Sequence, residues 1–143
     1  MAGRSVLWSG VSALFTDDRG RVLLEDVAYR RVCLLPGGAI DCGEAPSLAV
    51  AREVREELGL TRRFSRPLAV DWVPPDAPGY PQGFPGETIY VFDGETLAEN
   101  DLARIHVPER EVTGVRWVEP ALLPQYMAPG NARRALAACG WCT

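Results

Sequence analysis

The chain has 143 residues, of which 47% are hydrophobic and 24% are charged, and its formal net charge is −4. These values predict one domain spanning residues 1–143, with a core that needs neither disulfides nor a structural metal. They exclude a broadly basic surface for nucleic acid or an anionic membrane. No segment approaches the roughly 20 apolar residues of a membrane-spanning helix. Residues 1–10 lack the apolar run of a secretory signal, so we expect a cytoplasmic protein.

The first 60 residues predict three strands followed by one helix. Residues 6–16 and 21–26 are rich in apolar and β-branched side chains and flank a turn signal, so we expect a hairpin. A further short strand is expected at 33–35. The clearest helix spans 46–58, because a proline suits its first turn and Gly59 follows its last residue.

The rest of the chain predicts more strands, a long loop and weaker helices. Residues 74–86 contain five prolines and three glycines, so we expect a loop there. Asn131 is a candidate N-cap for a last helix that ends at Ala138. The other predicted elements are strands at 64–73, 87–92 and 112–118 and a short helix or turn at 120–126. Together they predict an α/β fold with a mixed β-sheet sandwiched between helices.

Three carboxylates are expected on one face of the predicted helix 46–58. Glu53, Glu56 and Glu57 stand at i, i+3 and i+4, whereas Val54 and Leu58 fall on a different face that can pack on the sheet. Like charges at this spacing repel each other. Taken alone, the cluster is most simply interpreted as a solvated acidic surface.

A divalent cation would turn this repulsion into attraction, since clustered carboxylates suit hard ions such as Mg²⁺ or Mn²⁺. Arg52 lies one turn before Glu56 and can orient a carboxylate or contact a phosphate. The adjacent Gly37 and Gly38 let the backbone approach a ligand closely, and their carbonyls could supply another oxygen. Glu44 stands near the helix entrance, where the helix dipole favours negative charge.

The segment from Gly38 to Leu60 resembles the signature of the Nudix hydrolase family. That signature is Gly, five residues, Glu, seven residues, Arg-Glu, an aliphatic residue, any residue, Glu-Glu, any residue, Gly and an aliphatic residue. Every specified position matches, although the signature covers only 23 of the 143 residues; the matches are Gly38, Glu44, Arg52, Glu53, Val54, Glu56, Glu57, Gly59 and Leu60. Nine fixed positions at fixed spacing are far more specific than a lone phosphate-loop motif.

The resemblance implies an α/β/α fold and a metal-dependent pyrophosphohydrolase that uses Mg²⁺, with Mn²⁺ as the alternative ion. It implies that Glu53, Glu56, Glu57 and the carbonyl of Gly38 or Gly37 are the metal ligands. It also implies that Arg52 and Glu44 hold the loop and the helix in register. Water would attack a phosphorus of the diphosphate linkage, with one of the helix glutamates or a later carboxylate as the general base.

Three carboxylates outside the helix are candidates for that base, namely Glu87, Glu109 and Glu111. We favour Glu111, because some members of the family place an acidic residue just ahead of a strand like the one that contains Trp117. The candidate catalytic residues are therefore Glu56, Glu57, Glu111 and Arg52.

The signature does not identify the group attached to the diphosphate. The loop 74–86 is the expected specificity element, and Trp72, Tyr80 and Phe84 are candidates to stack a base, although loop aromatics are more often packing anchors. Pro75 lies fifteen residues after Leu60, a spacing that resembles enzymes acting on ADP-ribose. We therefore expect a small-molecule nucleotide substrate, with ADP-ribose-like compounds or nucleotide sugars ahead of nucleoside triphosphates.

Several alternatives remain open at this point. One is a housecleaning hydrolase of nucleoside triphosphates, and another is a non-catalytic module that senses a nucleotide, although such a module could lose the glutamates freely. The acidic net charge disfavours an enzyme that removes RNA caps. No membrane partner is expected, and the resemblance leaves a homodimer open, because related proteins are often dimers.

The cysteines and the single histidine carry no predicted chemistry. Cys139 and Cys142 have the spacing of a redox or zinc motif, but no second pair completes a zinc site and no strand-then-helix setting precedes them. Cys33 and Cys42 are also expected to be free thiols. His106 is interpreted as a surface residue.

Overall fold

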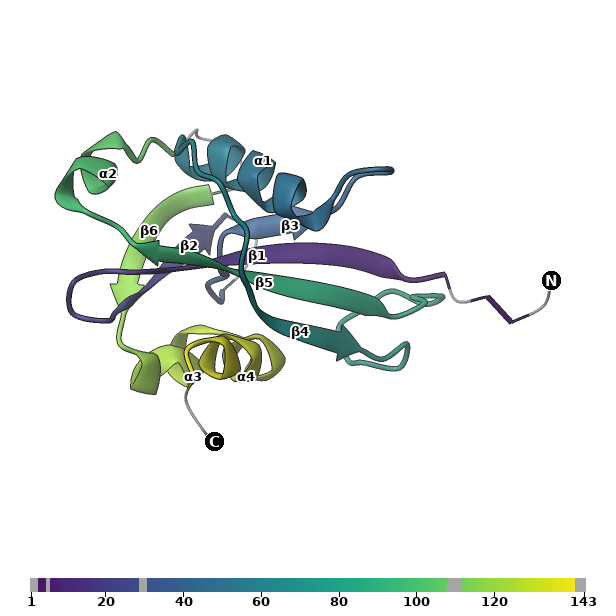
Figure 1. Ribbon diagram of the computed structural model, residues 1–143. Coiled ribbons are helices and arrows are strands. Elements are labelled where there is room, and N and C mark those ends of the chain that lie inside the picture. Colours follow the sequence, from purple (N-terminus) through teal and green to yellow (C-terminus); the bar gives the residue numbers. More distant parts are fainter. Residues whose placement is uncertain (1–2, 5, 29–30, 108–111, 141–143) are drawn as a thin grey trace.

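A computed structural model describes residues 3–4, 6–28, 31–107 and 112–140. Within them the strands form one mixed sheet in the order β4-β5-β1-β2-β6, with β3 paired to β1 (Figure 1). The β1–β5 pair is parallel and the other pairs are antiparallel. The strands are β1 (Trp8–Thr16), β2 (Val22–Val27), β3 (Gly37–Ala39), β4 (Pro67–Val73), β5 (Glu87–Thr96) and β6 (Val112–Val118).

Helices cover both faces of this sheet, which confirms the predicted fold class. Figure 1 shows α1 on one face and α3 and α4 on the other. The helical elements are α1 (Pro46–Leu58), α2 (Glu99–Arg104), the 3-10 turn η1 (Pro120–Leu122), α3 (Leu123–Tyr126) and α4 (Pro129–Ala138). None of the described helices is long and apolar enough to cross a lipid bilayer.

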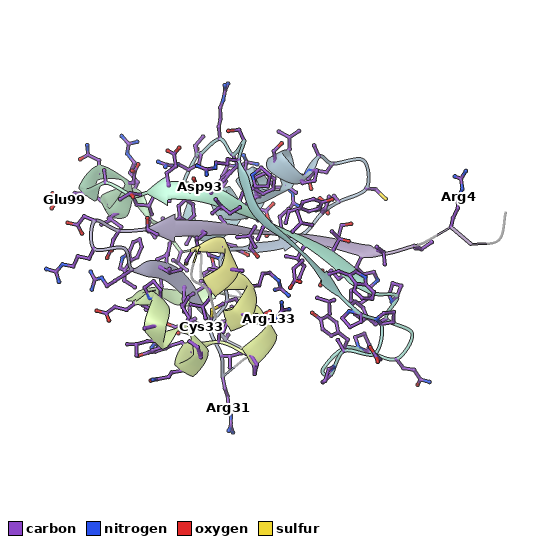
Figure 2. The ribbon with its side chains drawn as sticks, turned by 60° about the horizontal axis from the view of Figure 1, so that its bottom comes forward. Arg4, Arg31, Cys33, Asp93, Glu99 and Arg133 are labelled. Carbon is purple, nitrogen blue, oxygen red and sulfur yellow. The ribbon has the colours of Figure 1, made fainter. Side chains whose placement is uncertain are left out.

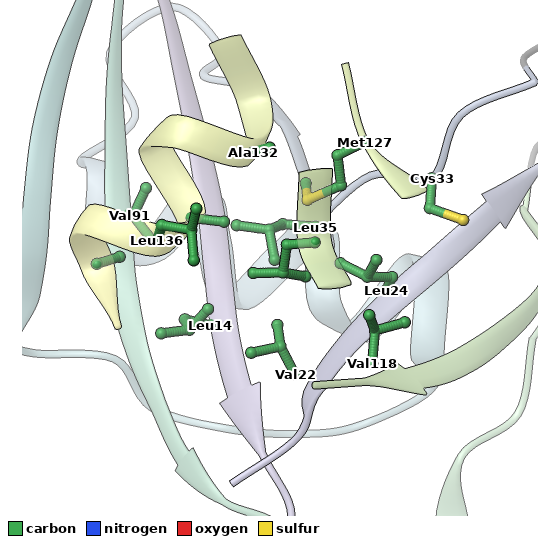
Figure 3. Close-up of a cluster of buried hydrophobic side chains, with 13 residues drawn as sticks. Leu14, Val22, Leu24, Cys33, Leu35, Val91, Val118, Met127, Ala132 and Leu136 are labelled. Carbon is green, nitrogen blue, oxygen red and sulfur yellow. The ribbon is translucent and has the colours of Figure 1, made fainter. Parts of the chain in front are cut away.

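Alternation along the central strands supplies two separate cores. Phe15 and Leu23 point towards α1 and pack in a cluster with Val54, whereas Leu14 and Leu24 point to the opposite face. Figure 3 shows that second cluster, in which these leucines meet the side chains of α4 and of the segment before it. Because successive residues of a strand face opposite sides, one strand can serve both layers.

Helix α1 occupies the predicted residues 46–58, because local signals fix both of its ends. Proline stands in its first turn, and Gly59 adopts the left-handed conformation at φ 71° while donating its N–H to the carbonyl of Arg55. Val50, Val54 and Leu58 are fully buried against the sheet, so the opposite side of the helix is left for the charged residues.

Two local predictions were wrong, and one helix was missed. Residues 33–35 form no strand and contribute only a bridge between Leu34 and Glu25, since the pairing with β1 begins at Gly37 instead. Helix α2 was not predicted, because it buries none of its residues and so carries no apolar pattern. Helix α4 begins at Pro129 rather than after Asn131, because proline at the first helical position sets the start.

We expect Gly59→Ala to destabilise the fold by about 1–2 kcal/mol, the cost of a left-handed conformation for a residue with a Cβ atom. The new methyl group would also lie 3.2 Å from the carbonyl oxygen of His106. Urea unfolding of both proteins measures the difference. Gly130→Ala is the matched control, since its Cβ meets nothing within 4 Å and its φ is ordinary. An equal loss of stability in both variants would contradict the proposed role of the cap.

Candidate active site

The two glycines of β3 allow close packing at the centre of the candidate site, Gly38 against α1 and Gly37 against β1. A Cβ atom on Gly38 would lie 2.6 Å from the carboxyl group of Glu53, and one on Gly37 would overlap the carbonyl oxygen of Val11. Both positions therefore require glycine for steric reasons. The Glu53 carboxylate consequently packs directly over the β3 backbone.

Arg52 connects this strand, the loop before α1 and the helix itself. Its Nε and Nη2 atoms donate to the two oxygens of Glu44, each at 2.9 Å, and Nη2 also donates to the carbonyl of Ala39 at 3.0 Å. Nη1 donates to Glu53 at 2.9 Å and more weakly to Glu56 at 3.4 Å. The guanidinium thus uses all five N–H groups, and it holds the loop against the helix.

These bonds set the charge states of the pair. Hydrogen bonds from Arg52 lower the pKa of Glu44 to about 2, with a smaller contribution from the backbone N–H of Asp41. The same contacts raise the pKa of Arg52 above its ordinary value. Glu44 is therefore ionised at neutral pH, and this ion pair is present throughout the physiological range.

A carboxylate that sequence reasoning missed lies behind the helix. Glu25 of β2 is only 2% exposed, its side chain shares a hydrogen bond with Glu57, and its Oε2 atom has no partner among the described residues. Glu57 in turn accepts the N–H of Gly37 at 2.9 Å. A signal was present in the sequence, because Glu25 follows three apolar residues in a predicted strand at the position where another inward side chain is expected.

Burial shifts these carboxyl groups towards the protonated form. It raises the pKa of Glu25 to about 10, with the neighbouring Glu57 adding to the effect, and raises the pKa of Glu57 to about 7. Burial also raises the pKa of Glu53, although Arg52 opposes this shift. The site therefore concentrates more negative charge than its surroundings stabilise.

The structure brings Glu53, Glu57 and Gly38 together, whereas the side chain of Glu56 lies at the outer rim and is 56% exposed. In the part of the chain that is described, no three acidic, histidine or cysteine side chains already surround one point as a closed metal cage. The donor set is nevertheless all oxygen, anionic and short of cations. It therefore fits a hard divalent ion such as Mg²⁺ or Mn²⁺.

Two clefts flank this centre. The first, of about 270 Å³, extends from Gly37 and Gly38 to Tyr80 of the loop and Arg134 of α4. The second, of about 570 Å³, lies between the start of β1 and the loop before α1. Ala39 and Glu87 line both clefts, so the two meet beside β3.

Glu87, a candidate base, stands at this junction at the start of β5. A Cβ atom on Gly10 would lie 2.9 Å from its Oε2 and 3.5 Å from the carbonyl oxygen of Gly38. Burial raises the pKa of Glu87. The preferred base Glu111, together with Glu109, lies outside the described residues.

The three candidate stacking residues occupy different environments. Trp72 lies on the edge strand β4 and is 57% exposed. Tyr80 lines the first cleft and stacks on Phe84, with ring centroids 4.1 Å apart. Phe84 is 3% exposed and packs with Val73 and Ile89, so its ring anchors the loop and has little surface left to meet a ligand.

Of His106 and the described cysteines, only Cys42 lines one of the two clefts. His106 is exposed, and its backbone N–H donates to the carbonyl of Leu58. Cys33 is buried and donates to Asp26, Cys42 is exposed, and Cys139 is a free thiol of α4's C-terminal end. Cys142 lies outside the described residues.

Comparison with known proteins identifies relatives of similar architecture. The model of the NUDIX domain matches residues 6–139. A relative from Bacillus subtilis (strain 168), named as an 8-oxo-dGTP diphosphatase, is 30% identical over 70% of this chain and 58% of its own length. The ADP-ribose pyrophosphatase of Mycobacterium tuberculosis is 28% identical over 93% of this chain and 63% of its own length. The chain thus spans about three fifths of both curated relatives.

A solved structure extends this likeness to the whole fold. The MutT protein from Methanosarcina mazei Go1 superposes with a TM-score of 0.73 at 22% identity, covering 97% of this chain and 96% of that chain. At this level of identity the likeness concerns the fold alone.

We expect the metal-free protein to lose stability as pH rises from 5 to 8. Glu25 and Glu57 have pKa values raised above the ordinary 4.5, so the folded chain binds more protons than the unfolded chain in this range. A divalent cation favours the ionised carboxylates, so its stabilising effect should be larger at pH 8. Melting curves with EDTA or Mg²⁺ measure this, and we expect the Mg²⁺-induced increase in Tm to be at least about 4 °C larger at pH 8. An increase independent of pH would contradict the expectation.

Proposed function

This chain belongs to the Nudix family of pyrophosphohydrolases that act on phosphoanhydrides, and from that premise we propose that it hydrolyses the diphosphate linkage of a small nucleoside diphosphate derivative. The observation that carries the proposal is the placement of Glu53 and Glu57 against the β3 glycines, in a centre with excess negative charge. A solvated helix surface would not bury these carboxylates.

In the proposed reaction Glu53, Glu56, Glu57 and the carbonyl of Gly38 would hold the divalent cation. Bound Mg²⁺ or Mn²⁺ would neutralise phosphate charge and acidify water. Arg52 keeps the loop and α1 in register through Glu44.

The oxygen of the attacking water forms a bond to one phosphorus atom, and the bond from that phosphorus to the bridging oxygen breaks. The bridging oxygen leaves with the second phosphate group. We propose Glu111 as the general base that accepts the water proton, with Glu56, Glu57 and Glu87 as alternatives.

The two clefts support a substrate with a group on each side of its diphosphate, such as ADP-ribose or a nucleotide sugar. They meet at Ala39 and Glu87, beside the glycines of β3, so a diphosphate at this junction would direct one end group into each cleft. Tyr80 and Trp72 remain the candidate stacking residues. The M. tuberculosis relative, which aligns over most of this chain, is named an ADP-ribose pyrophosphatase.

A nucleoside triphosphate pyrophosphohydrolase is the second candidate function, because the B. subtilis relative is named as an 8-oxo-dGTP diphosphatase. Such a substrate carries an end group on one side only and would leave one cleft empty. A sensing module is disfavoured, since a module that only binds a nucleotide could lose Glu53, Glu56 and Glu57 freely.

A substrate panel with Mg²⁺ or Mn²⁺ tests the activity and its range. It contains ADP-ribose, nucleotide sugars, dinucleoside polyphosphates and common and oxidised nucleoside triphosphates. We expect metal-dependent cleavage of ADP-ribose or a nucleotide sugar, with kcat/KM reduced roughly 100-fold or more by Glu57→Gln. Glu99→Gln on the surface helix α2 is the charge-matched control (Figure 2). Preferred release of pyrophosphate from a triphosphate would favour the second candidate, and nucleotide binding without cleavage would favour the sensor.

We expect Glu111→Gln to lower kcat by about 10²–10⁴-fold, the usual contribution of a general base. The amide cannot accept the water proton, and the substitution should leave the unfolding midpoint unchanged. Stopped assays at saturating substrate measure kcat, with Glu99→Gln on α2 as the control. An unchanged rate in Glu111→Gln would transfer the role to Glu56, Glu57 or Glu87.

A further inference from the structure

Glu25 stands in a position that the packing would otherwise give to an apolar side chain. It belongs to β2, on the face towards α1, where Leu23 contributes to the hydrophobic cluster that includes Val54. With 2% of its surface exposed, Glu25 is as buried as these neighbours. Burial of a carboxylate without a counter-charge is strongly unfavourable, so such a residue in a core needs an explanation.

The next residue in the strand, Asp26, is an acidic side chain that does have an ion-pair partner. Asp26 points to the other face, where it pairs with Nη2 of Arg116 at 3.0 Å and accepts a hydrogen bond from Cys33. Glu25 has no ion pair among the described residues, and its Oε2 atom is buried without any partner. Its side chain shares a hydrogen bond with that of another acidic residue, Glu57.

The positive charge of Arg52 does not compensate the negative charge at the Glu25 end of the carboxylate cluster. The ion pairs in this cluster are formed by the guanidinium of Arg52. Its N–H groups donate to the carboxylates of Glu44, Glu53 and Glu56 and to the carbonyl of Ala39. Within the described residues, none of these bonds extends to Glu25 or Glu57. The cluster contains the carboxylates of Glu25, Glu44, Glu53, Glu56 and Glu57. The missing positive charge therefore belongs at the Glu25–Glu57 end.

We propose that Glu25 is a fourth carboxylate of the divalent-cation site, acting as a positioning residue through Glu57. This inference rests on the proposed function. Glu57 lies between the N–H of Gly37 on one side and the Glu25 carboxyl on the other, so both contacts fix its orientation. Glu25 also adds negative charge beneath the three helix carboxylates, which strengthens the attraction for a divalent cation.

The competing explanation is that Glu25 is a structural hydrogen-bonding residue, neutral in every state. The two explanations differ in what Glu25→Gln does. Glutamine keeps the size and the hydrogen-bonding capacity but removes the charge. A structural residue would tolerate this change without loss of cation affinity, whereas a carboxylate that serves the cation would not.

The experiment measures Mn²⁺ affinity by electron paramagnetic resonance of the free ion, together with the metal-free unfolding midpoint. We expect Glu25→Gln to weaken Mn²⁺ binding 10- to 100-fold, the usual effect of removing a group that orients a metal ligand. We also expect its metal-free midpoint to rise, because a neutral amide is buried at lower cost than a carboxyl group that has no counter-charge. Glu25→Met, which packs as an apolar side chain, should act in the same direction.

The control is Asp26→Asn, which removes the same charge one residue away on the opposite face and should change Mn²⁺ affinity less than twofold. Glu57→Gln is the reference variant, because it removes a proposed ligand of the cation and should lose Mn²⁺ binding. If Glu57→Gln loses Mn²⁺ binding but both Glu25 variants bind like the wild type, the role of Glu25 is overturned and the proposed function stands. If no variant changes Mn²⁺ affinity, the carboxylate centre itself is overturned.

Discussion

The Arg52 guanidinium joins the parts of the candidate site, because its N–H groups reach the loop before α1, the end of β3 and the carboxylates of the helix. This one side chain explains how acidic groups can gather on a helix face that packs against a sheet. It neutralises the outer part of the cluster and leaves the inner part uncompensated. The Arg52 ion pairs thus fix the loop and the helix in place, while the carboxylates that Arg52 does not reach keep an uncompensated negative charge. A cation can therefore be held at a defined point.

The β3 glycines determine how close the carboxylates of α1 lie to the β3 backbone. Any larger residue at position 38 would collide with the Glu53 carboxyl, so the spacing between α1 and β3 is set by the absence of a side chain. Glu57 then reaches the N–H of Gly37 across the same narrow gap. Precision at the site comes from a helix and a strand packed on a shared core, and a flexible loop contributes little to it.

Local signals and long-range packing account for what could and could not be predicted from the sequence. Helix α1 and its cap at Gly59 were predicted because proline and glycine act within one turn. The short strand β3 was misplaced by a few residues, since its pairing with β1 depends on contacts far apart in the chain. Glu25 was missed for a related reason: the strand pattern places it on an inward face, but its contact with Glu57 depends on how α1 packs on the sheet. The position of Glu87 between two clefts likewise depends on three strands meeting at one end.

The buried ring of Phe84 anchors the loop of residues 74–86 to the sheet. Its small cluster with Val73 and Ile89 is separate from the two cores on either face of the sheet. Tyr80 of this loop lines the first cleft, so a substitution there can alter the wall of that cleft while the main cores keep their packing. Such a separate attachment allows the loop to change at little cost to folding. The carboxylate centre is built into α1 and the central strands, so a substitution there would disturb the packing of a core as well as the site itself.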